Sequence, residues 1–148
     1  MKQINYLLLF VFFSASFYLI SQSLTFNAKT GDTVLDEKLK ALNAEAITNI
    51  SEFRSHIAME FQTSETKITE LLEIMEPAEI LFAYQIAAVN STSIDKIVTK
   101  YKQNKNEGWA VIIQKLGISQ QSEKFKDLKN LSIYGKSAIY VNELSQNK

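Results

Sequence analysis

The spacing of hydrophobic residues changes once along the chain. Residues 4–20 are almost uniformly apolar, interrupted only by Asn5 and two serines. From Thr33 to Leu131 the apolar residues recur at steps of three and four with charged residues between them, which is the period of an amphipathic helix. Strand-like sequence is confined to a short stretch at 138–141. The pattern predicts an all-α fold.

Capping residues and one proline divide the periodic region into five to seven short helices. The expected N-caps are Ser51, Ser64 and Ser93. Pro77 suits a first helical position, and the segment it starts, 77–89, is apolar on nearly every face. Gly117 fits a left-handed helix end, with Ile118 able to contact Ile113 in a Schellman ending. We expect 77–89 to be the central, most buried helix.

The apolar run at the start has the organisation of a secretory signal peptide. It follows Lys2 and leads to Ser21-Gln22-Ser23. This places small residues at positions −3 and −1 relative to a cleavage after Ser23. An uncleaved membrane anchor is the alternative, because residues 4–20 reach the lower limit for a spanning helix. No basic cluster follows to stop transfer, so we predict an exported protein of the periplasm or extracellular space whose mature form does not span the membrane.

The predicted organisation has four parts. They are a signal peptide at 1–23, a flexible lead-in at 24–32, an all-helical domain at 33–132 and a weakly structured tail at 133–148.

Composition excludes several function classes. The 148 residues include no Cys and one His, so disulfides, thiol nucleophiles and Cys-ligated zinc are absent. No Gly-x-Ser-x-Gly nucleophile motif is present either. We therefore expect a non-enzymatic protein with no cofactor.

Charge is balanced overall, with 16 basic and 16 acidic residues, but it is divided between two halves. Residues 32–79 contain 11 acids and 4 bases, whereas residues 95–136 contain 9 lysines and 4 acids. The tentative binding residues are Trp109, Tyr101, Lys100, Lys102, Lys105 and Lys115. They suit a protein partner or an anionic envelope component. The export signal and the lack of Arg in this half argue against nucleic acid. The alternatives to an external partner are internal pairing of the acidic half with the basic half and head-to-tail self-association of the protein.

Trp109 is the most conspicuous single candidate. As an exposed residue it would be a strong partner-binding anchor. We favour a core position, in which the small Gly108 permits close approach of the last helices to the central one.

Two acidic groups suggest catalytic alternatives. Glu52, His56 and Glu60 share one helix face at four-residue steps, and they are a weak candidate metal site for a metal-dependent envelope enzyme. Three ligands in a row on one helix point along its axis instead of converging, so an exposed face is the better interpretation. A second group, Glu73, Glu76 and Glu79, offers paired acids for glycoside cleavage, but acids at helix starts already have a role there.

One stretch carries a family resemblance. Residues 98–118 contain Tyr101-Lys102, Gly108-Trp109 and Lys115-Leu116-Gly117-Ile118, and the stretch resembles a motif of small exported bacterial proteins of uncharacterised function. The upstream segment 76–83 is similar to the same group's Pro-Gly-Asp-Ile-Tyr-x-Ala-Leu segment, and the similarity covers about 53–131. The chain departs from the group's pattern at Ala78, at Ala110 and at residues 119–122. These departures bear on tight turns and not on the fold. The resemblance implies export and an all-helical fold, and it implies no activity.

Overall fold

Seven α-helices and no strand make up residues 26–131, the part of the chain that the computed structural model describes. They are α2 (Thr33–Thr48), α3 (Ile50–Glu60), α4 (Glu65–Leu72), α5 (Pro77–Val89), α6 (Ile94–Asn104), α7 (Trp109–Lys115) and α8 (Glu123–Lys129). The prediction of an all-α fold with five to seven short helices is confirmed for this part. The predicted signal peptide, the tail and the possible strand at 138–141 lie outside the described residues.

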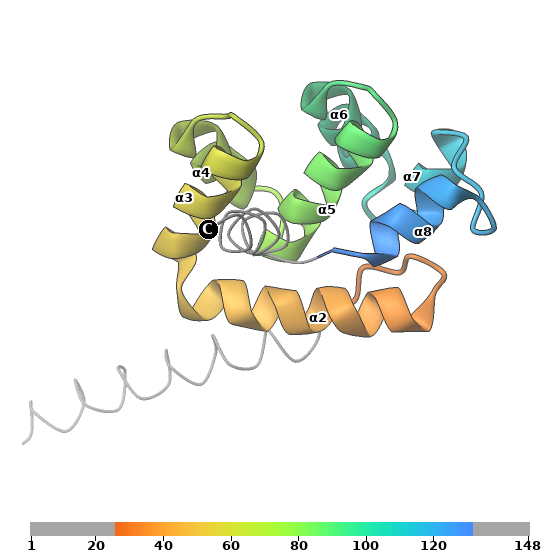
Figure 1. Cartoon of the computed structure of the whole chain (residues 1–148), viewed down its shortest axis with the longest axis horizontal. Helices are drawn as coiled ribbons and strands as arrows, with labels where there is room; N and C mark the ends of the chain where they lie inside the picture. The colour runs from red at the N-terminus through yellow and green to blue at the C-terminus, as the bar shows by residue number, and fades with distance from the viewer. Residues whose placement is uncertain (1–25, 132–148) are drawn as a thin grey trace, which may run out of the picture.

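Helix α5 is the centre of the fold. It contacts α2, α4, α6 and α8, and nine of its 13 residues are buried. Figure 1 shows α5 between the α3–α4 pair and the α7–α8 end, with α2 passing along one side of the molecule. A helix surrounded by others needs apolar residues on every face, as the sequence of 77–89 predicted.

Helix α2 is the longest described helix, and it covers one side of α5. Leu35, Leu39, Leu42 and Ala46 are buried at three- and four-residue steps and form its inner face. Asn43 lies on this face too and is 0% exposed. A polar residue in that position requires hydrogen-bond partners inside the protein.

Most predicted helix ends are confirmed. The hydroxyl groups of Ser64 and Ser93 cap α4 and α6, and Pro77 is the first residue of α5. The C-terminal end of α7 has both bonds of a Schellman motif. Gly117, with φ +75°, donates to the carbonyl of Gln114 at 2.9 Å, and Ile118 donates to that of Ile113 at 3.1 Å.

The predicted N-cap Ser51 is wrong by two residues. Helix α2 continues to Thr48, and Asn49 caps α3 by accepting a hydrogen bond from the backbone of Glu52. Asn caps a helix about as well as Ser does. A break of one residue leaves Ser51 inside the first turn of α3.

The lead-in, predicted to be flexible over 24–32, is packed where the structure describes it. Residues 26–32 form no helix, but Ala28 and Thr30 are only 2% and 1% exposed. The carbonyls of Ala28 and Lys29 accept hydrogen bonds from the first two backbone N–H groups of α7, at 3.0 and 2.9 Å. These donors have no partner within a helix, so the lead-in satisfies the start of α7.

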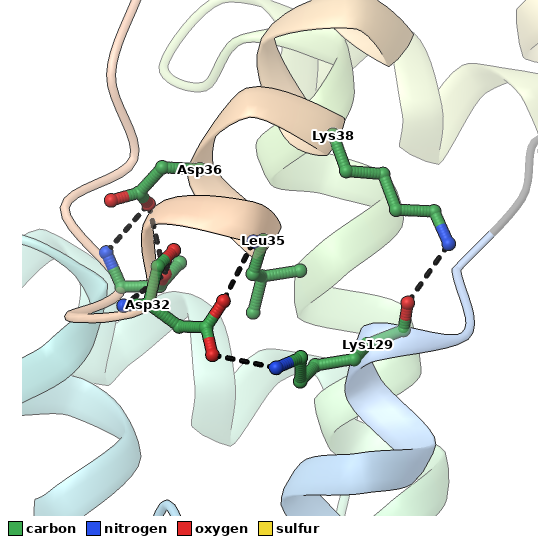
Figure 2. Close-up of polar contacts among 6 residues, drawn as sticks. Asp32, Leu35, Asp36, Lys38 and Lys129 are labelled. Carbon is green, nitrogen blue, oxygen red and sulfur yellow. Dashed lines mark hydrogen bonds and ion pairs between the residues drawn. The ribbon is translucent and has the colours of Figure 1, made fainter.

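The start of α2 is joined to the end of α8 by a group of polar contacts (Figure 2). Asp32 caps α2 by accepting from the backbone of Leu35 at 2.9 Å, and its second oxygen accepts from Lys129 Nζ at 2.7 Å. Lys38 Nζ donates to the carbonyl of Lys129 at 2.8 Å. The hydrogen bond from Lys129, followed by that from Leu35, holds the pKa of Asp32 below its usual range.

Candidate functional site

Trp109 is a core residue and does not offer its ring to a partner. It is 1% exposed, its Nε1 donates to Glu79 Oε1 at 3.1 Å, and its ring lies 5.1 Å from that of Phe82. The expectation of a core position is confirmed. The expected role of Gly108 is wrong: it permits close approach of the lead-in and not of the central helix, since a Cβ there would be 2.5 Å from the Cβ of Lys29.

Tyr101 is buried as well. It is 2% exposed, its ring centroid lies 5.4 Å from that of Trp109, and its hydroxyl donates to Glu79 Oε2 at 2.7 Å. Burial, followed by the hydrogen bond to Glu79, raises the pKa of Tyr101 far above its usual value. The hydroxyl therefore remains a donor, and both aromatic members of the predicted binding set hold Glu79 in place.

The carboxylates of Glu76 and Glu79 are used to start α5. Glu79 Oε2 accepts from the backbone of Glu76 at 3.0 Å, which completes a capping box. Asn43 adds a bond from α2, because its Oδ1 accepts from the buried backbone N–H of Ala78 at 3.1 Å and its Nδ2 donates to Glu76 Oε2 at 3.2 Å. Asn43 was not among the residues predicted from the sequence. Its signal was a polar residue within the apolar stripe of α2.

Two of the four predicted binding lysines are held by contacts inside the protein. Lys105 Nζ donates to the carbonyl of Ile74 at 3.0 Å and lies 5.6 Å from the centre of the Tyr101 ring. Lys115 Nζ donates to Asn104 Oδ1 and lies 4.0 Å from a carboxylate oxygen of Glu107. Neither arrangement follows from sequence spacing.

The other two lysines, Lys100 and Lys102, form no ion pair among residues 26–131, and neither does their neighbour Lys96. Lys96 and Lys102 are exposed and Lys100 is partly exposed. Asp95, the acid at the start of the same helix, is engaged by Lys67 of α4 at 2.9 Å. This bond raises the pKa of Lys67. We call Lys96, Lys100 and Lys102 the α6 lysines.

Pairing between the acidic and basic halves is limited. Across residues 26–131, Asp32 and Lys129 form the one ion pair that joins an acid of the first half to a lysine of the second. The charge separation predicted from the sequence therefore persists on the surface of the described domain.

The weak metal candidate lies on α3, and the expectation of an exposed face is wrong for two of its members, since the side chains of His56 and Glu60 are only 13% and 6% exposed. His56 Nε2 and Glu60 Oε2 are 3.7 Å apart, while Glu52 Oε2 accepts from the side chain of Asn49 at 2.6 Å. Within the described ranges, no group of three or more His, Cys, Asp or Glu residues is arranged to hold a metal ion.

A hollow of about 470 Å³ opens where the lead-in meets the α4–α5 connection, the end of α6 and the start of α7. Its charged lining residues are Lys29, Glu73, Glu76, Glu79 and Lys105. The rest of the lining consists of several apolar residues, Tyr101, Trp109 and the polar residues Asn27 and Asn106. The hollow brings together three of the predicted binding residues with all three acids of the predicted acidic group.

None of the helices in residues 26–131 is long and apolar enough to cross a membrane. Comparison of the chain with protein-family models, curated proteins and solved structures gave no match. The resemblance to small exported bacterial proteins therefore stays a prediction, and the class that the fold defines is an all-α helical domain.

Proposed function

We propose that this protein is exported and non-enzymatic, and that it binds a negatively charged component of the cell envelope through the α6 lysines. The observation that carries the proposal is the charge arrangement on α6. Three lysines lie within seven residues without an ion pair in the described domain, and Lys67 engages Asp95, the acid at the start of that helix.

The chemistry favours an extended anion over a specific small ligand. An ammonium group is a hydrated point charge that attracts phosphate without requiring one geometry. Several such groups on one helix raise the local positive potential and concentrate polyanions near it. Phosphate groups of acidic lipids or of a wall polymer fit this requirement, and the attraction should weaken as salt screens it.

Charge reversal on α6 tests the proposal. The variant Lys100→Glu/Lys102→Glu should lose binding to phosphatidylglycerol vesicles by about tenfold or more at low salt, since each lysine near an anionic surface is worth about 1 kcal/mol. The matched control is Lys124→Glu/Lys126→Glu on α8, where Lys124 donates to Asn90 and Lys126 pairs with Glu123. Vesicle co-sedimentation measures both variants, and equal losses would contradict the assignment to α6.

Two probes separate the possible sources of phosphate. Binding to phosphatidylglycerol vesicles but not to soluble polyphosphate identifies a lipid surface, and the reverse result identifies a polymer. Phosphatidylcholine vesicles are the neutral control. Failure of the wild-type protein to bind either anionic probe would refute the proposed function.

Export is checked by cell fractionation with a C-terminal tag. We expect the protein outside the cytoplasm with an N-terminus at Leu24, as read by mass spectrometry, because cleavage is predicted after Ser23. Recovery of the full-length chain in the cytoplasm would rule out this part of the proposal.

A further inference from the structure

The hollow beside the lead-in, defined above by its lining residues, is separate from the α6 lysines, none of which lines it. Its volume, about 470 Å³, lies within the range of small-molecule sites. Exposed charged residues and partly buried apolar ones share its lining, so a ligand there would contact both kinds.

Glu79 is the most enclosed acid of the hollow, and its partners are all neutral. Its Oε1 accepts from Trp109, and its Oε2 accepts from Tyr101 and from the backbone of Glu76. An ionised carboxylate offers about four acceptor sites, so one remains on Oε1. No cation among residues 26–131 forms an ion pair with Glu79.

An ammonium group already lies in the lining of the hollow. Lys105 Nζ lies 5.6 Å from the centre of the Tyr101 ring and donates to the carbonyl of Ile74 at 3.0 Å. An aromatic face together with a carbonyl oxygen is the environment that attracts cations. Lys105 is an exposed residue at the end of α6, so its side chain can leave this position for solvent without unfolding the helix.

The charge balance of the lining also favours a cation. Three carboxylates, from Glu73, Glu76 and Glu79, face two ammonium groups, from Lys29 and Lys105. When Lys105 moves into solvent, three negative charges remain against one positive charge. An anionic ligand would have to approach the Glu79 carboxylate, which repels it.

We infer that this hollow binds an organic ammonium ion, a primary amine joined to an apolar body, which takes the place of the Lys105 ammonium group over Tyr101. The apolar body packs against the partly buried side chains of Phe26, Leu72 and Ile74, which line the same hollow. Lys105 then acts as an internal competitor for the site.

The test uses 2-phenylethylamine with two probes of matched shape, the neutral 2-phenylethanol and the anionic 3-phenylpropionate. Titration is followed by the NMR signal of the single indole N–H, which belongs to Trp109 in the lining. We expect saturable binding of the amine alone. Equal responses to all three probes, or no saturable response to the amine, would overturn the inference.

Lys105→Met removes the ammonium group of the internal competitor and keeps an unbranched side chain that is one atom shorter. It should tighten binding of the amine by about two- to fivefold, the factor that an exposed cation–π contact represents. Lys102→Met is the matched control, because Lys102 is a lysine of α6 that does not line the hollow. An unchanged or weakened affinity in Lys105→Met, with a native circular dichroism spectrum, would contradict the competition.

Glu73→Gln tests the charge complementarity without touching the start of α5. Glu73 is exposed and follows the last residue of α4. The variant should weaken amine binding by about twofold or more, as expected for loss of a partly screened charge. Affinity equal to that of the wild-type protein would show that the carboxylates do not attract the ligand.

Discussion

Gly108 and Gly117 have similar left-handed φ angles, +86° and +75°, but different surroundings. The ψ of Gly108 is 175°, a combination that only glycine adopts readily. A Cβ at Gly108 would also lie 2.5 Å from Lys29 Cβ and 3.1 Å from its carbonyl oxygen, whereas a Cβ at Gly117 meets nothing within 4 Å. Gly108 therefore combines a restrictive backbone conformation with a steric conflict, whereas Gly117 has a left-handed φ and open space around it.

Substitution by alanine should affect the two glycines unequally. Gly117→Ala should lower the free energy of unfolding by about 1 kcal/mol, the cost of a left-handed alanine. Gly108→Ala should lower it by roughly 2–3 kcal/mol, because strain and displacement of the lead-in add together. Urea denaturation measures both values, and equal losses would show that neither the strain at Gly108 nor its contact with Lys29 adds to the cost.

The role of a candidate residue was predictable from the sequence only where it does not depend on a partner far away in the chain. The core position of Trp109 was predictable, since a large aromatic residue after a glycine and before an apolar turn is typical of a core. The roles of Lys105 and Glu79 were not, because Lys105 binds a carbonyl 31 residues away and Glu79 accepts from an indole 30 residues away. Such partners depend on how α5, α6 and α7 pack.

At the scale of elements, the contact between α2 and α5 rests on a buried side chain that the apolar pattern did not explain. Asn43 occupies the inner face of α2 and accepts from the backbone N–H of Ala78 in the first turn of α5. That N–H has no partner within its own helix. Because the bond is buried, water cannot replace Asn43 without rearrangement.

Asn43→Ala should lower the free energy of unfolding by about 2–3 kcal/mol, since it leaves a buried donor unsatisfied. Asn49→Ala is the comparison, because Asn49 is an exposed N-cap whose loss should cost about 1 kcal/mol. Thermal unfolding followed by circular dichroism measures the difference. A smaller loss for Asn43→Ala than for Asn49→Ala would mean that the α2–α5 bond contributes little.

At the scale of the whole molecule, the contacts of Asp32 join the two ends of the described domain. They connect the start of its first helix to the end of its last one, 97 residues away (Figure 2). A bond that spans most of the chain forms only in the folded state. Its strength therefore appears in the stability of the whole domain and in the dependence of that stability on pH.

The lowered pKa of Asp32 sets the direction of this dependence. The carboxylate stabilises the folded state at pH values above its unfolded pKa, near 3.8, and the contribution is lost as pH falls through the lower folded value. Asp32→Asn retains a capping side chain but loses the charge, so it should be less stable at pH 7 by about 0.2–1 kcal/mol. The two proteins should converge in stability at acid pH. Urea denaturation at several pH values measures this, and a constant difference would exclude the ion pair as its cause.

The sequence by itself determined the all-α class, the central helix and most helix ends. These features depend on periodicity and on groups within a few residues, such as Ser64, Ser93 and Gly117, which act on their own turns. The tertiary structure decided which candidate residues remain available. Packing buried Trp109 and Tyr101 on Glu79, placed Lys105 over Tyr101, and left the α6 lysines exposed or partly exposed. The physical reason is that burial and pairing depend on distances between residues far apart in the chain, which local spacing does not encode.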